Sequence, residues 1–218
     1  MANIPGFSKN VMVIDHPMVQ HKLTLLRDKE TGSKQFRELI KELAMFEGYE
    51  ATRHFQLEPT QVTTPICQTT AYTLKGRKVA IVPILRAGLG MVEGILELIP
   101  AARVGHIGLY RDHETHLPVE YYCKFPEDIE TREVLIVDPM LATGGSASAA
   151  IEFIKARGVP SERIRLLVII AAPEGIQTVV DTDPRITIYT CAIDDHLDES
   201  AYIVPGLGDA GDRIFGTK

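Results

Sequence analysis

The sequence lacks the features of a membrane protein or of a protein stabilised by disulfides. Its three cysteines, Cys67, Cys123 and Cys191, lie far apart and form no CxxC pair. No run of about 18 uninterrupted apolar residues occurs, the length that a membrane-spanning helix requires. The first six residues carry no charged lead and no apolar segment, so no secretory signal is expected. We therefore expect reduced thiols, no membrane contact and a cytoplasmic location.

An excess of basic charge is also missing. The formal net charge is -6 over 218 residues, and no block of five or more like charges occurs. Because a nucleic-acid-binding surface usually carries a basic face, we do not expect a nucleic-acid partner. No G-x-S-x-G motif is present, and no cysteine has a histidine close to it in sequence, so covalent catalysis has no evident nucleophile.

Apolar runs alternate with helical patterns along most of the chain. The expected strands are 79–85, 104–110, 119–123, 134–137, 166–171 and 186–190, and the helices between them are 89–99, a helix from about Ala147, and 174–180. A continuous apolar run such as 79–85 is typical of a parallel strand that is buried on both faces. The order predicts an α/β fold, a mostly parallel twisted sheet flanked by helices, in one domain spanning 1–218.

Segments outside this repeat have their own patterns. Asp15-His16-Pro17 predicts a helix start, and 33–54 has the apolar stripe of an amphipathic helix, which is also a candidate subunit contact. Residues 1–55 are thus expected to form an N-terminal helical arm. Residues 62–74 predict two short strands about Pro65, and the polar insert 111–118 between two strands is expected to act as a mobile flap.

The stretch from Val134 to Ser146 is the most informative part of the chain. An apolar strand ends in Asp138, passes through Ala142-Thr143-Gly144-Gly145-Ser146, and enters a helix. Such a turn leaves backbone N–H groups bare at the positive end of the helix, where they can hold a phosphate. No Lys follows the glycines, so it is not a Walker loop. The simpler alternative is an ordinary turn with Ser146 or Thr143 as the N-cap.

Two arginines follow other buried strands. Arg86 comes after the run 79–85, and Arg111 comes after 104–110. The carboxyl ends of parallel strands meet at one edge of a sheet, which is where ligands bind in open α/β folds. A guanidinium fork at that edge suits the oxygens of a polyanion. The alternative is a surface arginine paired with a neighbouring acid.

The C-terminal segment 200–218 contains a second cluster of glycines. Gly206, Gly208 and Gly211 match G-x-G-x-x-G, but no βαβ unit follows, so the match does not indicate a dinucleotide site. A glycine-rich terminus can simply fray. Here Tyr202, Ile203, Val204, Ile214 and Phe215 are apolar enough to anchor the segment. The glycines between these anchors would then present bare peptide groups to a flat ligand.

Two polar clusters are weaker candidates for a site. The segment 112–116 (Asp-His-Glu-Thr-His) has the residue types of a metal site but not the i, i+4 helical spacing, so we do not expect it to bind a metal. Asp194, Asp195, His196, Asp198 and Glu199 are expected to form a solvated loop.

The segment from Asp138 to Ser146 resembles the phosphoribosyl diphosphate (PRPP) loop of the type I phosphoribosyltransferases. Its form Val-Asp-Pro-Met-Leu-Ala-Thr-Gly-Gly-Ser, like the C-terminal segment, is similar to that of the uracil phosphoribosyltransferases. The resemblance implies that PRPP is bound by Arg86, Arg111, Asp138, Pro139, Met140, Leu141, Ala142, Thr143, Gly144, Gly145, Ser146 and Asp209. It also implies that uracil is bound by Ile203, Gly208, Asp209 and Ala210.

In this resemblance the catalytic residues are Arg86, Arg111, Asp138 and Asp209. Pro139 departs from the wider superfamily, in which a second acid follows the first at this point of the loop. Since a proline ring cannot bind a ribose hydroxyl or a metal ion, we expect Asp209 to supply that contact.

The resemblance implies a pyrimidine-salvage enzyme that converts uracil and PRPP to UMP and diphosphate with Mg2+, in a homodimer or homotetramer. GTP or another nucleotide tunes activity in some relatives, and the sequence does not show whether one does so here. Two other classes stay open. A phosphoribosyltransferase for another base would keep the loop and change the C-terminal segment. A non-enzymatic, nucleotide-binding regulator of RNA should show a basic face, which the charge of -6 disfavours.

Overall fold

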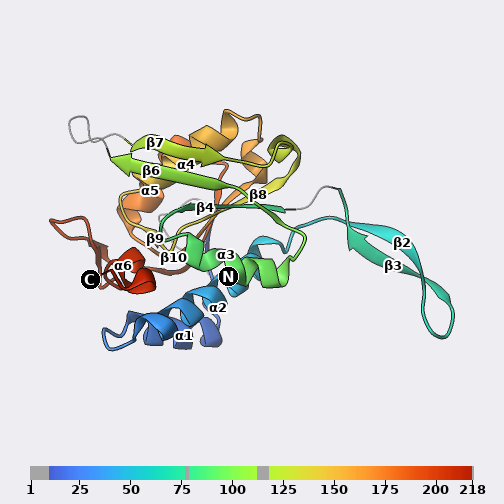
Figure 1. Cartoon of the computed structure of the whole chain (residues 1–218), viewed down its shortest axis with the longest axis horizontal. Helices are drawn as coiled ribbons and strands as arrows, with labels where there is room; N and C mark the ends of the chain where they lie inside the picture. The colour runs from blue at the N-terminus through green and yellow to red at the C-terminus, as the bar shows by residue number, and fades with distance from the viewer. Residues whose placement is uncertain (1–9, 77–78, 112–117, 218) are drawn as a thin grey trace.

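A mostly parallel sheet forms the centre of the chain (Figure 1). The computed structural model describes residues 10–76, 79–111 and 118–217. Within these ranges the sheet has nine strands, with β1, β11, β10, β8, β4, β6 and β7 in that order, β5 beside β4, and β9 beside β10. Only the pair β6 and β7 is antiparallel. The strands are β1 Val11–Val13, β4 Val79–Leu85, β5 Arg103–Val104, β6 His106–Arg111, β7 Pro118–Lys124, β8 Glu133–Val137, β9 Met140–Leu141, β10 Ile164–Ala171 and β11 Thr187–Ile193.

Helices cover both faces of this sheet, so the predicted fold class is confirmed. Helices α1, α2 and α3 pack on one face, at the bottom of Figure 1, and α4 and α5 pack on the other. The helices are α1 Pro17–Arg27, α2 Ser33–Ala51, α3 Leu89–Leu98, α4 Gly145–Lys155, α5 Pro173–Thr182 and α6 Ala210–Phe215. Short 3-10 turns, η1 Ile129–Thr131 and η2 Ser161–Arg163, precede β8 and β10. No helix in the described ranges combines the length and apolar character needed to cross a membrane.

Alternate residues of the central strands enter two separate cores. Val79 and Ile81 of β4 pack with α1, α2 and α3, whereas Ala80 and Val82 pack with α4 and α5. All four are completely buried. Because both faces are covered, these strands carry unbroken apolar runs rather than alternating apolar and polar residues.

Two expected elements differ in detail from the structure. The strand expected over 104–110 is divided at Gly105, whose backbone N–H donates to the carbonyl oxygen of Ile81 at 2.9 Å. A Cβ at Gly105 would lie 2.9 Å from a ring carbon of Phe125, so the chain takes this path only with a glycine. The expected helix 33–54 ends earlier, at Ala51.

The apolar stripe of α2 is used within the chain. Phe36, Ile40 and Leu43 are completely buried and belong to the core that α2 shares with α1, α3 and the sheet. This part of the predicted N-terminal arm therefore packs on the body, and its apolar face is not open to a second subunit.

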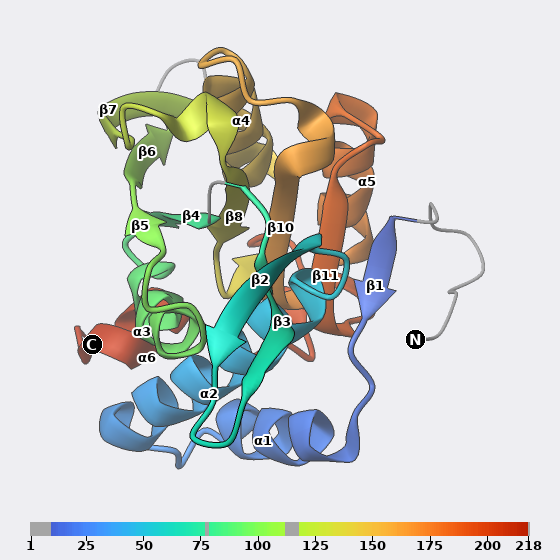
Figure 2. The same ribbon diagram turned by 90° about the vertical axis from the view of Figure 1, so that its right-hand side faces the viewer.

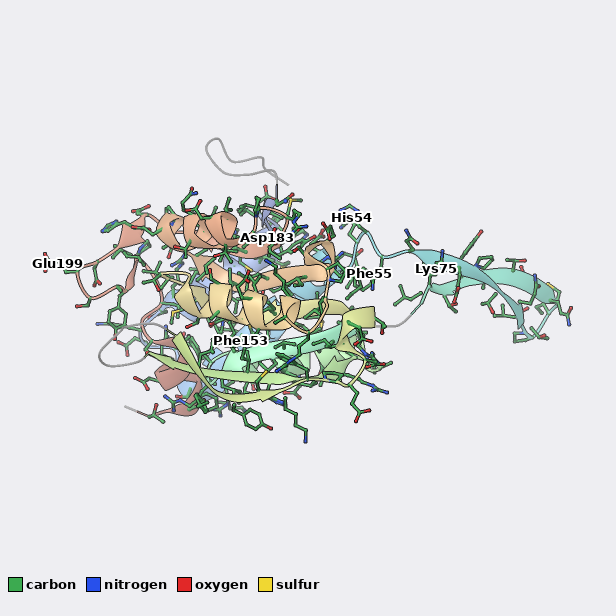
Figure 3. All side chains as sticks on the ribbon, turned by 90° about the horizontal axis from the view of Figure 1, so that it is seen from above. His54, Phe55, Lys75, Phe153, Asp183 and Glu199 are labelled. Atoms are coloured by element: carbon green, nitrogen blue, oxygen red, sulfur yellow. The ribbon has the colours of Figure 1, made fainter. Side chains whose placement is uncertain are left out.

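The segment that projects is instead a hairpin formed by β2 Leu57–Thr63 and β3 Gln68–Leu74, which pair only with each other (Figures 1 and 2). Its first strand begins five residues before the predicted position. It includes Pro59, a residue that strands accept where no partner needs the backbone N–H. His54, Phe55 and Lys75 lie at the base of the hairpin, and Glu199 lies at the opposite end of the body (Figure 3).

Candidate functional site

The predicted phosphate loop begins at the carboxyl end of β8. The backbone N–H of Asp138 donates to the carbonyl oxygen of Leu167 at 3.1 Å, and the carbonyl oxygen of Pro139 accepts from Ile169 and Ile170, each at 3.1 Å. Pro139 and Leu141 are buried. Their side chains therefore belong to the protein interior, and any contact they make with a ligand is restricted to the backbone.

The turn into α4 places a glycine at the N-cap. The N-cap is Gly144, with φ at +83°, and it makes no side-chain cap hydrogen bond. The alternative in which Ser146 or Thr143 is the N-cap residue is therefore wrong. The N–H groups of the first turn have no partner within a helix, so the start of α4 can bind an anion.

Two glycines set the position of this turn against α5. A Cβ on Gly144 would lie 2.7 Å from Cβ of Thr178 and 2.8 Å from the carbonyl oxygen of Gly175. A Cβ on Gly175 would in turn collide with the carbonyl oxygen of Ala142. The backbones of the turn and of α5 are thus in direct contact, which only glycine at both positions permits.

Gly145 differs from Gly144 both in backbone conformation and in packing. Its φ is not positive, and the nearest atom to a Cβ at this position would be Oγ1 of Thr143 at 3.9 Å. Neither backbone conformation nor packing within the chain therefore requires a glycine here. The open space beside Gly145 is where an anion on the first turn of α4 would lie.

Asp138 occupies the start of the loop. Its side chain is half-buried, and Oδ1 accepts a hydrogen bond from the backbone N–H of Met140 at 3.3 Å. Burial raises the pKa of the Asp138 carboxyl from 3.8 to about 7, and the Met140 N–H lowers it by a smaller amount. The acid therefore changes its charge near neutral pH, as is common for groups in functional sites.

The loop that carries Arg86 lies against the end of β8. A Cβ on Gly88 would collide with the carbonyl oxygen of Val137, the residue before Asp138. Arg86 is exposed, and its guanidinium lies 5.8 Å from the ring centre of Phe215 in α6. In the described ranges no carboxylate forms an ion pair with Arg86, so the alternative of a surface arginine paired with an acid finds no partner there.

Arg111 is the last residue of β6, and its backbone pairs with Pro118 of β7. The parallel pairing of β4 with β6 brings Leu85 opposite Gly108, so Arg86 and Arg111 leave the sheet at the same edge. Residues 112–117, which include most of the predicted flap and the whole cluster 112–116, lie outside the described residues. Within the described part of the chain, no group of three or more His, Cys, Asp or Glu is placed to hold a metal ion.

The C-terminal segment is folded, not frayed. Strand β13 Ile203–Val204 pairs with β12 His196–Leu197, and α6 follows. Of the residues predicted to bind uracil, Ile203 and Ala210 are buried, whereas Gly208 and Asp209 are exposed. The side chains of Ile203 and Ala210 anchor the segment, so any contact that these two residues make with a ligand is through the backbone, and Gly208 and Asp209 lie at the surface.

Asp209 has a structural role that the sequence did not reveal. It is the N-cap of α6, and its Oδ1 accepts from the backbone N–H of Asp212 at 2.8 Å. The segment also packs beside the Arg86 loop. A Cβ on Gly211 would lie 4.0 Å from Cβ of Ala87, and one on Gly90 would lie 3.0 Å from Cδ1 of Ile214. The three predicted segments, around Arg86, Asp138 and Asp209, therefore meet at one edge of the sheet.

Two further residues hold the C-terminal segment and were missed or misread in the sequence. Asp194, predicted to lie in a solvated loop, is only 6% exposed and pairs with Arg27, the last residue of α1. The prediction was therefore wrong for Asp194, whereas the other four residues of that cluster are exposed as predicted. The available signal was position, because Asp194 directly follows β11, just as Asp138 follows β8. Arg213 was also missed, and it donates to the carbonyl oxygens of Leu26 at 2.8 Å and Leu207 at 2.9 Å.

Comparison with known proteins gives a consistent picture over nearly the whole chain. The family model described as uracil phosphoribosyltransferase matches residues 13–217. The uracil phosphoribosyltransferase of Alkaliphilus oremlandii is 63% identical over 208 residues, covering 95% of this chain and 99% of the relative. That of Clostridium tetani is 62% identical over the same length and coverage.

Solved structures agree with these matches. The AQ2163 protein of Aquifex aeolicus is 35% identical, with a TM-score of 0.89 over 95% of this chain and 99% of that chain. A variant of the hypoxanthine phosphoribosyltransferase of Trypanosoma cruzi, in complex with IMP, is 14% identical, with a TM-score of 0.51 over 74% of this chain and 76% of that one. This second likeness concerns the fold alone.

The contrast between the two loop glycines gives a first prediction. We expect Gly145→Ala to change the free energy of unfolding by less than about 1 kcal/mol but to weaken PRPP binding roughly tenfold or more, because the added methyl group enters the anion space. Titration calorimetry with PRPP and urea unfolding measure the two effects.

Gly144→Ala is the matched control. It should lower the free energy of unfolding by about 1–3 kcal/mol, since the residue has a positive φ and its Cβ meets α5. Unchanged PRPP affinity in Gly145→Ala would show that the phosphate does not lie on the first turn of α4.

Proposed function

The chain belongs to the uracil phosphoribosyltransferase family, and from this premise we propose how its residues convert uracil and PRPP to UMP and diphosphate. The observation that carries the proposal is the start of α4, with a glycine at its N-cap. The open space at Gly145 belongs to the loop that begins at Asp138 and lies at the same sheet edge as the folded C-terminal segment. That arrangement provides one support for a sugar phosphate and a separate one for a base.

The 5′-phosphate of PRPP is held by the backbone amides from Ala142 to Ser146. This support is rigid because Gly144 is packed against α5, and the Thr143 and Ser146 hydroxyls are additional donors. A fixed phosphate acts as a pivot that brings the anomeric carbon C1 of the ribose to a constant position.

Arg86 and Arg111 neutralise the diphosphate as it leaves. Both follow strands at the sheet edge, and a guanidinium fork matches the spacing of phosphate oxygens. The donor set fits Mg2+ held mainly by PRPP itself, because Mg2+ keeps few protein ligands on such substrates and the described residues offer no multi-ligand cluster. Asp209, which is exposed at this edge, would be its protein ligand, and the bound ion would supply further charge neutralisation to the diphosphate.

Uracil is recognised by the peptide groups of the C-terminal segment, chiefly at Gly208 and Ala210, with Ile203 anchoring the turn from the core. The two carbonyls and two N–H groups of uracil can all be satisfied by the main chain. Cytosine reverses the donor and acceptor at one edge, and each unpaired group that results costs about 1–3 kcal/mol. The segment therefore selects uracil.

In the reaction, the bond between C1 and the diphosphate oxygen breaks as the bond from uracil N1 forms on the opposite face, and the N1 proton is released. Positive charge develops on the ribose ring during this displacement. The carboxylates of Asp138 and Asp209 orient the ribose hydroxyls and stabilise that charge.

The hairpin supports a further part of the proposal, assembly into a homodimer or homotetramer. Its side chains Leu57, Ile66 and Tyr72 are 58%, 91% and 67% exposed, and an isolated two-stranded hairpin is marginally stable in water. Apolar side chains exposed on a projecting arm are typical of an interface, and a second copy of this chain is the occupant we propose. A monomer in sedimentation velocity at micromolar concentration would contradict this assignment.

We also place the protein in the cytoplasm. None of the three cysteines, all of which lie in the described ranges, forms a disulfide, and Cys67 is exposed. Thiols of this kind persist in a reducing compartment.

The activity is tested by diphosphate release with PRPP and Mg2+ against a panel of bases. We expect turnover with uracil and little with cytosine, hypoxanthine, adenine or orotate. Preference for another base would support the alternative in which the loop is kept and the base segment differs. Salt-sensitive RNA binding without turnover would support the regulator, although the net charge of -6 disfavours it.

Asp209 both caps α6 and carries a negative charge, and two different substitutions separate these roles. Asp209→Asn keeps a good N-cap, so the free energy of unfolding should change by less than about 0.5 kcal/mol. Turnover should fall roughly 10- to 1000-fold because the carboxylate charge is lost. Asp209→Ala, the control that also loses the cap, should in addition cost about 1 kcal/mol of stability. Near-normal turnover in Asp209→Asn would remove the role assigned to this acid.

The raised pKa of Asp138 predicts a pH dependence. The carboxylate form is the active one, and protonation removes it as the pH falls through about 7. In wild-type enzyme, kcat/KM for PRPP should therefore decrease toward acid pH, by up to about tenfold per pH unit. Asp138→Asn should have lower activity without this acid limb, beyond the part due to PRPP ionisation. An identical pH profile for both proteins would show that another group is responsible.

A further inference from the structure

A closed set of hydrogen bonds joins Arg27, Asp194 and Gly206. The guanidinium of Arg27 donates to both carboxylate oxygens of Asp194, at 2.8 and 2.5 Å, and to the carbonyl oxygen of Gly206 at 2.6 Å. The backbone N–H of Gly206 donates to Oδ2 of Asp194 at 2.9 Å. Both polar backbone groups of Gly206 are therefore held by the same ion pair.

The two charged residues are fixed to the body of the protein. The backbone N–H of Asp194 donates to the carbonyl oxygen of Ala171, the last residue of β10, at 2.8 Å. Arg27 ends α1, whose apolar residues Leu23 and Leu26 are buried in the core. The ion pair thus connects the sheet edge and α1 to a segment that is more than 170 positions away from Arg27 in the sequence.

Gly206 is the point at which the base-binding segment turns. Its φ is +65°, and a Cβ here would collide with the carbonyl oxygen of Ile203. Leu207 is buried after it, and then Gly208 and Asp209 emerge at the surface. The direction in which these two residues leave the turn is set by the position of the Gly206 peptide groups.

We infer that Arg27 and Asp194 are positioning residues for the pyrimidine, acting through Gly206 on the backbone that reads the base. The inference rests on the proposed function of the C-terminal segment. A base recognised by peptide groups has no side chain that can adjust to a misplaced loop. A displacement of about 1 Å can therefore cost on the order of 100-fold in rate.

If the ion pair had a purely structural role, its replacement would not raise the uracil KM selectively. Replacing a buried ion pair by apolar residues of similar size often leaves stability unchanged or improves it. The double variant Arg27→Met with Asp194→Leu should therefore fold, while the Gly206 peptide groups lose both of their partners. The comparison of the two KM values then reports on base recognition separately from stability.

The test measures the KM for uracil and the KM for PRPP separately in the double variant, together with its thermal midpoint. We expect a thermal midpoint lowered by a few degrees, because the buried Gly206 N–H and carbonyl lose their partners, a uracil KM raised roughly 10- to 100-fold, and a PRPP KM within about twofold. The PRPP KM is preserved because Asp194 connects to the phosphate loop through the backbone of Ala171, whose pairing with Leu141 neither substitution removes.

Arg27→Lys gives a second, milder measurement. A single ammonium cannot occupy the bidentate geometry with Asp194 and also reach the Gly206 carbonyl as the guanidinium fork does. The uracil KM should therefore rise, by less than in the double variant. This measurement decides the question if the double variant fails to fold.

Asp183 provides a matched control. It is also buried, at 3% exposure, and is held by Arg185 through two hydrogen bonds at 2.9 and 2.8 Å, but it lies beyond α5, far from the C-terminal segment. Asp183→Asn should lower the thermal midpoint without changing the uracil KM.

Three results would overturn the inference: an unchanged uracil KM in the double variant or in Arg27→Lys, an equal rise in both KM values, or a raised uracil KM in Asp183→Asn. Calorimetric binding of UMP to the wild type and the variants gives the same comparison without turnover. A wild-type protein that releases no diphosphate with uracil would instead contradict the proposed function.

Discussion

The contact between two glycine backbones, Gly144 in the phosphate loop and Gly175 in α5, determines where the start of α4 lies. Neither residue can carry a side chain without meeting the backbone of the other element. The anion site is therefore not a flexible loop that closes on its ligand but the end of a helix that is already in place. Such a support can fix a sugar phosphate before any chemistry begins.

In the proposed function the two ligands rest on different parts of the molecule. The proposed phosphate support belongs to β8, α4 and α5 and shares the core on one face of the sheet. The proposed base support belongs to the C-terminal segment, which packs on α1, α2 and α3 at the other face. The two supports meet at the carboxyl edge of the strands, where Arg86 and Asp138 lie and where the backbone of Ala171 joins Asp194 to the phosphate loop. A change that displaces one support is thus expected to affect the ligand on that support more than the other.

Local sequence pattern was sufficient to predict the elements whose apolar residues are contiguous or regularly spaced. The strand 79–85 has the predicted bounds, and the parallel sheet with helices on both faces follows from the repeated spacing. The loop between Asp138 and Ser146 was also recognised, because its small residues are contiguous. Its cap was not, since Gly144 is fixed by Gly175 of a later helix, which no local pattern shows.

The other residues that were misread in the sequence were misread for the same reason. Asp194 lies among acids that look solvated, and only its contact with Arg27, 167 positions earlier, makes it a buried group. The hairpin was predicted only in part, because strands exposed on both faces, such as 57–63, carry no alternation of apolar and polar residues. Burial and pairing over long sequence distances decide such cases, and the sequence pattern contains neither.

The central claim is that one nucleotide joins two separately anchored supports. A crystal structure of the protein with UMP tests it most directly. The account predicts the 5′-phosphate on the backbone amides from Ala142 to Ser146, beside Gly145, and the pyrimidine edge on the peptide groups of Gly208 and Ala210. A nucleotide bound anywhere other than between these two segments would contradict it.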